Sequence, residues 1–345
     1  MKKILALILA SSLSFAMLSG CTTPPAVTPD APDGSPAQDV PSAEGITLTL
    51  AEVHAEDYPT TLGDLEFARL VEERSEGRIK VDVRFAGVLG SEEDVLDSLT
   101  IGSLDFGRVS LSPVSQHNSD LNVLMLPYIY RDANHMWAVL NGEIGAEIMA
   151  GIESAGLVGL TWYDAGARNF YAREPIPNAE SLRGLKVRVQ ANPLMQGIVS
   201  ALGANPVSMA LGEVYPALST GTVDAAENSI PSYESTSHYE VAPYMLVSEH
   251  TRVPEILLAS KQVMDGLSQE DRDIIMQAAK DSQTFQIEKW REREEESLEK
   301  MEANENFTIY ELDDSERQIF VDAMAGVVAE HGAGNEELIE RIRNT

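Results

Sequence analysis

The sequence of 345 residues predicts an α/β protein with two compact units. Residues 46–109 alternate between strand-like runs of period two and helical runs, and this order predicts a mainly parallel sheet covered by helices. Short strands and helices begin again after Gly156, which indicates a second α/β unit. A helical pattern then extends from Gln269 to about Ala303. At ~1.5 Å per residue this helix is longer than a small domain is wide, so we expect it to lie across both units.

Local patterns define the elements of the first unit. The expected strands are residues 46–53, 78–85 and 105–109, and the expected helices are residues 62–75 and 91–101. Gly77 ends the first helix, because glycine readily adopts the left-handed backbone that closes a helix. Ser91 begins the second helix, because its hydroxyl can cap the backbone and the acids at 92–94 favour a helix N-terminus.

The elements of the second unit are shorter. Strands are expected at residues 156–163, 169–172 and 185–190, helices at 193–202 and 212–219, a further segment at 222–228, and an aromatic-containing loop at 229–244. Ser268 is expected to cap the long helix, with Asp271 at its third helical position. Gly332 and Gly334 interrupt the last helical stretch.

The N-terminus carries a targeting pattern. A positive segment and the apolar run Ile4–Leu18 precede Leu-Ser-Gly-Cys21, and the run is too short to span the ~30 Å of a bilayer core. The motif resembles a bacterial lipobox, which implies removal of a signal peptide, residues 1–20, and lipid attachment to Cys21, the only cysteine. Residues 21–45, rich in Pro, Ala, Thr and Ser, are expected to be a flexible tether. We therefore expect a lipid-anchored protein in the periplasm or on the outer face of the cytoplasmic membrane.

Charge and motifs exclude several functions. The net charge of −30 makes nucleic acid and anionic lipid surfaces poor partners, so an anionic ligand would require a local group of cations. The sequence has no helical His-x-x-x-His pair, no Gly-x-Ser-x-Gly elbow, no P-loop and no dinucleotide-binding glycine motif, and its six histidines are scattered. We expect no metal, no cofactor and no catalysis.

Three arginines, Arg108, Arg168 and Arg188, lie in or at the ends of expected strands. A buried guanidinium needs an anion, and its planar fork fits a carboxylate through two parallel hydrogen bonds. That carboxylate could belong to one of the many Asp and Glu residues, or to a ligand bound beyond the strand ends. The pattern alone leaves both interpretations open. Lys186, at the edge of its strand, is expected to extend into solvent.

Several linked motifs resemble one known family. They are Leu182–Gln190 (LRGLKVRVQ), Leu202–Met209 (LGANPVSM), Gly212–Leu218 (GEVYPAL), Thr220–Asn228 (TGTVDAAEN), Gly87–Glu92 (GVLGSE), Gly102–Phe106 (GSLDF), Leu126–Tyr128 (LPY) and Gly166–Arg168 (GAR). Taken in their order along the chain, they are similar to the motifs of DctP-type solute-binding proteins of TRAP (tripartite ATP-independent periplasmic) transporters, and the resemblance covers about residues 46–330.

The resemblance implies a two-lobe, periplasmic-binding-protein-like (Venus flytrap) fold with crossing hinge strands and a long helix that spans both domains. The implied boundaries are residues 46–164 with 254–293 for lobe I and residues 165–253 with 294–345 for lobe II. It also implies a protein that captures an organic acid and delivers it to a small and a large integral membrane subunit. We expect this protein to be a monomer.

The resemblance further assigns ligand-binding roles. Arg188 matches the arginine that clamps the ligand carboxylate, and Arg168 and Asn228 match ligand-side residues. The stretch 226–240, together with residues 106–111 and 249–254, is similar to a branch associated with sugar acids such as uronates.

A sugar acid needs hydroxyl partners besides the carboxylate clamp. Arg108, Gln190, Asn228 and Glu56 could provide them, although Glu56 could equally be a solvated loop acid. A C4-dicarboxylate, held by Arg188 with Arg168 or Arg108, is the alternative ligand, and an enzyme acting on sugar acids is the less favoured alternative function. The aromatic side chains of Trp162, Tyr163 and Phe170 are expected to belong to the core rather than to form a sugar platform.

Overall fold

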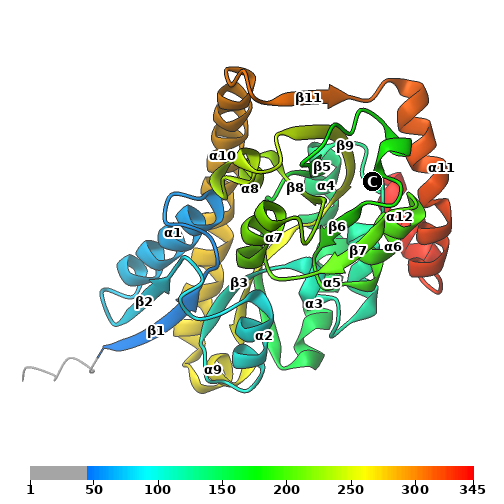
Figure 1. The fold of residues 1–345 in the computed structure, drawn as a ribbon. Coiled ribbons are helices and arrows are strands. Elements are labelled where there is room, and N and C mark those ends of the chain that lie inside the picture. The colour runs from blue at the N-terminus through cyan, green and yellow to red at the C-terminus, as the bar shows by residue number, and fades with distance from the viewer. Residues whose placement is uncertain (1–44) are drawn as a thin grey trace, which may run out of the picture. The chain divides into compact units, whose positions relative to one another are not determined.

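The computed structural model describes residues 45–345, and these residues contain two mixed β-sheets surrounded by helices (Figure 1). The predicted signal peptide, Cys21 and the tether up to residue 44 lie outside the described residues. Within the described part of the chain, no helix combines the length and apolarity needed to cross a membrane.

The first sheet has five strands in the order β2-β1-β3-β10-β4. Its strands are β1 (Ile46–Ala51), β2 (Ile79–Arg84), β3 (Phe106–Ser110), β4 (Leu157–Tyr163) and β10 (Glu255–Ser260). β1 pairs in parallel with β2 and β3, as the alternating pattern predicts, whereas β10 is antiparallel to β3 and β4.

The second sheet has six strands in the order β11-β9-β5-β8-β6-β7. Its strands are β5 (Ala167–Ala172), β6 (Lys186–Val189), β7 (Asn205–Ser208), β8 (Ala225–Asn228), β9 (Tyr244–Arg252) and β11 (Thr308–Glu311). The chain passes between the sheets where β4 leads into β5 and where β9 leads into β10. The predicted two-lobe α/β fold with crossing strands is therefore confirmed, while the residue boundaries of the lobes stay a prediction.

The α-helices cover both sheets (Figure 1). They are α1 (Pro59–Arg74), α2 (Glu92–Thr100), α3 (Leu111–Val114), α4 (Ala133–Leu140), α5 (Glu143–Gly151), α6 (Pro193–Ala201), α7 (Val214–Thr220), α8 (Ile230–Ser235), α9 (Lys261–Gly266), α10 (Gln269–Glu302), α11 (Asp314–His331) and α12 (Glu336–Asn344). Short 3-10 helices are η1 (Ser119–Met125), η2 (Ile152–Ala155), η3 (Ala179–Leu182), η4 (Leu211–Glu213) and η5 (His238–Glu240). Ser91 and Ser268 cap α2 and α10 as predicted, each accepting a backbone N–H three residues later.

The long helix α10 has 34 residues and contacts elements of both sheets. It packs along α1 and β4 beside the first sheet and against α8, which follows β8 of the second. Arg293 of α10 donates to Glu234 at 2.7 Å and to Asp57, which precedes α1, at 3.4 Å. The expectation that this helix spans both units is confirmed.

The prediction of a loop at residues 229–244 is wrong in one respect, because this segment contains α8 and η5. α8 has only six residues, too few to show a helical period. Pro231 and Tyr233 are buried in it, and Tyr233 packs in a core cluster with residues of the second sheet. Trp162, Tyr163 and Phe170 are buried in the core, as predicted.

Candidate functional site

A cavity of about 550 Å³ is lined by residues from both sheets and their loops. The first sheet contributes the loops that follow β1 and β2, because the carboxyl ends of these parallel strands meet at one edge. The second sheet and its loops contribute Arg188, Gln190 and Ala191 at the end of β6, residues 209–212, and part of the 228–238 segment. Four of the predicted ligand residues, Arg188, Arg168, Asn228 and Gln190, lie in this lining.

Arg188 is a buried cation whose side chain has no acidic partner within ion-pair distance among residues 45–345. It is the third residue of β6, and only 3% of its surface is exposed. Its Nε and Nη2 donate to the Met209 carbonyl at 3.0 and 2.7 Å. Burial lowers the pKa of its guanidinium, because few charges nearby compensate for the lost hydration. An anion that entered the cavity would satisfy this group.

Arg168, in contrast, is paired within the protein. It forms a salt bridge with Glu227, and its Nη2 also donates to the Glu227 carbonyl at 2.8 Å. Burial alone would raise the pKa of the Glu227 carboxyl, but Arg168 and His250 lower it to about 2. Glu227 is therefore ionised and neutralises Arg168.

Asn228 is held with one end free. Its Oδ1 accepts from Arg168 Nη1 at 3.1 Å and from the Ser229 backbone N–H at 2.8 Å. These bonds orient the side-chain amide, and its NH₂ has no acceptor within residues 45–345. Asn228 can thus donate to a ligand in the cavity.

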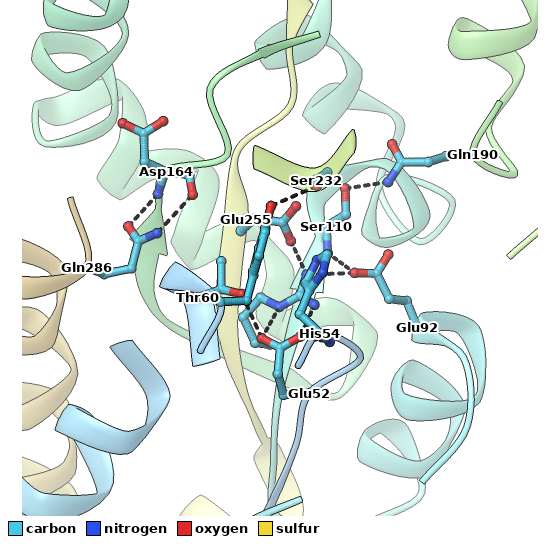
Figure 2. Close-up of polar contacts among 12 residues, drawn as sticks. Glu52, His54, Thr60, Glu92, Ser110, Asp164, Gln190, Ser232, Glu255 and Gln286 are labelled. Carbon is cyan, nitrogen blue, oxygen red and sulfur yellow. Dashed lines mark hydrogen bonds and ion pairs between the residues drawn. The ribbon is translucent and has the colours of Figure 1, made fainter. Parts of the chain in front are cut away.

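Gln190 joins the two sheets across the cavity. Its Nε2 donates to Ser110 Oγ, at the end of β3, at 2.9 Å (Figure 2). Its Oε1 is buried and has no hydrogen-bond partner in the described part of the chain. A buried acceptor left unpaired costs roughly 1–3 kcal/mol, so Gln190 is suited to accept a hydrogen bond from a ligand hydroxyl.

The structure does not bring Arg108 or Glu56 to the cavity wall. Arg108 on β3 is fully buried and forms ion pairs with the carboxylates of Glu52, Glu92 and Glu255. Figure 2 shows these three acids close to one another. Glu56 is exposed in the loop after β1, outside the lining. The sequence allowed an internal ion pair for each of the three arginines. Among residues 45–345 the structure shows one for Arg108 and one for Arg168 but none for Arg188.

Two of the acids around Arg108 themselves line the cavity, and sequence reasoning missed them. Glu92 begins α2 and Glu255 begins β10, and each accepts from Arg108 Nη1. Burial raises the pKa of both carboxyls, that of Glu255 to about 7. Burial alone would also raise the pKa of the Glu52 carboxyl, but Arg108 and His54 lower it to about 2, so Glu52 is the ionised partner of Arg108.

The two walls of the cavity therefore differ in hydrogen-bonding character. The second sheet presents donors, namely the Arg188 guanidinium and the Asn228 amide, whereas the first sheet presents the carboxyl oxygens of Glu92 and Glu255. A ligand with one carboxylate and several hydroxyls matches this arrangement. A second carboxylate beside Glu92 and Glu255 would add negative charge to a site where burial already raises the pKa of two carboxyls, so a proton would have to be taken up there or binding would be weakened.

Glu255 makes stability depend on pH in a defined direction. Because its pKa in the folded state is raised from 4.5 to about 7, its contribution to stability is fully present below about pH 4.5 and is lost as the pH rises through about 7. As the pH rises from about 4.5 to about 7, the free energy of unfolding of Glu255→Gln is therefore expected to increase relative to that of wild type. Urea denaturation across the window measures the difference. The exposed Glu56→Gln is the matched control, and an equal change in both variants would contradict the assignment.

Comparison with known proteins gives consistent matches. The family model of DctP, described as bacterial extracellular solute-binding protein, family 7, matches residues 50–335. The C4-dicarboxylate-binding periplasmic protein DctP of Rhodobacter capsulatus is 30% identical over 301 residues, which are 87% of this chain and 88% of that protein.

Crystal structures of TRAP periplasmic solute-binding proteins are similar to this fold. One is a TRAP periplasmic solute-binding protein from Bradyrhizobium sp. in complex with D-galacturonate, which is 42% identical, has a TM-score of 0.84 and covers 87% of this chain and 100% of its own. Another is a TRAP periplasmic solute-binding protein from Pseudomonas putida with bound D-glucuronate. It is 33% identical, has a TM-score of 0.84 and covers 87% of this chain and 97% of its own.

Proposed function

Because this chain belongs to family 7 of the bacterial extracellular solute-binding proteins, the solute receptors of TRAP transporters, we propose that it binds a hexuronate such as D-galacturonate or D-glucuronate. Receptors of this family are extracytoplasmic and work with membrane permease subunits. Our proposal adds a monomeric receptor, without catalysis, anchored through a lipid on Cys21 and the tether 21–45.

The observation that carries the ligand proposal is the contrast between the cavity walls. The ligand carboxylate pairs with Arg188, which has no acidic partner among residues 45–345. The sugar hydroxyls donate to Glu92 and Glu255 and to the unpaired Gln190 Oε1. Because these contacts come from both sheets, a bound uronate stabilises the state in which the lobes enclose it.

The same contrast disfavours a C4-dicarboxylate. Arg168 and Arg108 could have held a second carboxylate, but each is already neutralised by buried acids of the protein. The relatives with bound galacturonate and glucuronate also support the uronate, whereas the Rhodobacter capsulatus relative is named for C4-dicarboxylates.

Calorimetric titration of the purified protein tests the proposal. We expect D-galacturonate or D-glucuronate to bind at least ~30-fold more tightly than either succinate or galactose. Succinate would place a second carboxylate beside Glu92 and Glu255. Galactose lacks the carboxylate that pairs with Arg188. NMR of the recovered ligand is expected to show it chemically unchanged. Tighter binding of succinate would contradict the uronate assignment, and a converted ligand would contradict a pure binding role.

A further inference from the structure

His238 lies in the cavity lining, together with Arg188 and Asn228. It begins η5, directly after Ser237, whose backbone has the left-handed φ of 55°. Only 1% of its surface is exposed. The function described so far gives this buried imidazole no role.

A hydrogen bond to a residue of β5 orients the His238 ring. The hydroxyl of Tyr171, which is fully buried on β5, lies 2.8 Å from His238 Nδ1. Burial raises the pKa of the Tyr171 phenol, so it keeps its proton. Within residues 45–345 this hydroxyl has no other hydrogen-bond partner.

The tautomer follows from this single partner. If Nδ1–H donated to the phenol oxygen, the buried phenol proton would have no acceptor, a cost of roughly 1–3 kcal/mol. Tyr171 therefore donates to Nδ1, and the ring hydrogen of His238 resides on Nε2.

The ring also stays neutral. Burial, and then the nearby Arg188 charge, lower the pKa of the His238 imidazole to about 3. Within the described residues the Nε2–H has no hydrogen-bond acceptor. Because His238 lines the cavity, a ligand bound there can supply this acceptor. The neutral His238 ring, near the Arg188 cation, can therefore donate a directed hydrogen bond to an anionic ligand without placing a second positive charge in the buried site.

We propose that His238 Nε2–H donates to the uronate carboxylate that Arg188 holds, and that Tyr171 is the positioning residue that keeps His238 in this tautomer. This inference rests on the proposed function. It predicts that the carboxylate is recognised by a charged donor from β6 and a neutral donor from η5, in addition to the Asn228 amide.

Calorimetry with D-galacturonate and D-glucuronate tests the role of His238. Since a hydrogen bond to a charged group is typically strong, His238→Leu is expected to weaken binding about 10-fold or more. His238→Gln, whose amide can place a donor near the Nε2 position, is expected to recover part of the loss. His135→Gln, at a buried histidine on α4 outside the cavity lining, is the control and should bind like wild type. Circular dichroism verifies that each variant is folded.

The positioning role of Tyr171 has a separate readout. In ¹⁵N NMR spectra of the ligand-free protein, we expect His238 to be protonated at Nε2 and unprotonated at Nδ1 throughout about pH 5 to 8. Tyr171→Phe should remove this tautomer preference and weaken binding. Tyr233→Phe removes a neighbouring buried hydroxyl that donates a hydrogen bond to the Ala242 carbonyl. This variant should leave the His238 tautomer and the uronate affinity unchanged.

The outcomes separate the two claims. An Nδ1–H tautomer in wild type, or a folded His238→Leu variant that binds uronates as tightly as wild type, would overturn this inference alone. Absence of uronate binding by wild type would overturn the proposed function, and this inference with it.

Discussion

Arg188→Ala is expected to lower the affinity for D-galacturonate or D-glucuronate by at least ~2 kcal/mol, roughly 30-fold. Two guanidinium groups line the cavity, and Arg188, unlike Arg168, has no acidic partner in the described part of the chain. Without Arg188 the bound carboxylate would remain in a desolvated site without its counterion. Arg188→Lys is expected to lie between wild type and Arg188→Ala, because an ammonium keeps the charge but loses the planar fork. Calorimetric titration measures all three proteins.

Lys186→Ala is the matched control for this prediction. Lys186 lies two residues before Arg188 on the same strand, but its side chain is exposed, so its removal should leave affinity unchanged. Arg188→Ala should also remain folded, because no ion pair of residues 45–345 depends on Arg188. Equal affinities of Arg188→Ala and wild type would refute the carboxylate clamp.

Arg108→Met is expected to have the largest effect on stability, a loss of roughly 3–5 kcal/mol in the free energy of unfolding. Arg108 is the cation that contacts Glu52, Glu92 and Glu255, and methionine fills much of its volume while removing the charge. The Glu52 carboxylate would then be buried without a counterion. Chemical denaturation near neutral pH measures the loss, and acidification should reduce it as the freed carboxyls take up protons.

Arg69→Met is the control for this second prediction. Arg69 also pairs with two acids, Glu66 and Glu73, but on the exposed surface of α1, where ion pairs contribute little to stability. If Arg108→Met does not fold, Arg108→Lys provides the measurable variant and should be intermediate. A loss for Arg108→Met no greater than that for Arg69→Met would contradict the buried ion-pair network.

The helices α10 and α8 show which elements can be predicted from the sequence and which cannot. The long helix α10 was predictable within one or two residues, because a serine cap and an extended helical pattern are local signals. The helix α8 was not, because its six residues are stabilised by burial of Pro231 and Tyr233 rather than by a periodic pattern. His238 follows α8, so its place in the cavity wall also depends on that local fold.

The strand β10 illustrates the same limit for the first sheet. Residues 46–109 predict parallel pairing correctly, but β10 joins this sheet from residues 255–260 and pairs antiparallel with β3 and β4. This pairing brings Glu255 to Arg108, which is 147 residues away in the sequence. No local pattern carries that information, so the acidic wall of the cavity was not predicted.

By itself, the sequence determined the two α/β units, the long helix, the family motifs and the three strand arginines, because these depend on local periodicity and motif order. Only the tertiary structure decided which arginine lacks an anion. Arg108 and Arg168 meet acids from distant strands, whereas Arg188 meets a backbone carbonyl and the cavity. The physical reason is that charge compensation depends on proximity in space, and the partners here are separated by as many as 147 residues of chain.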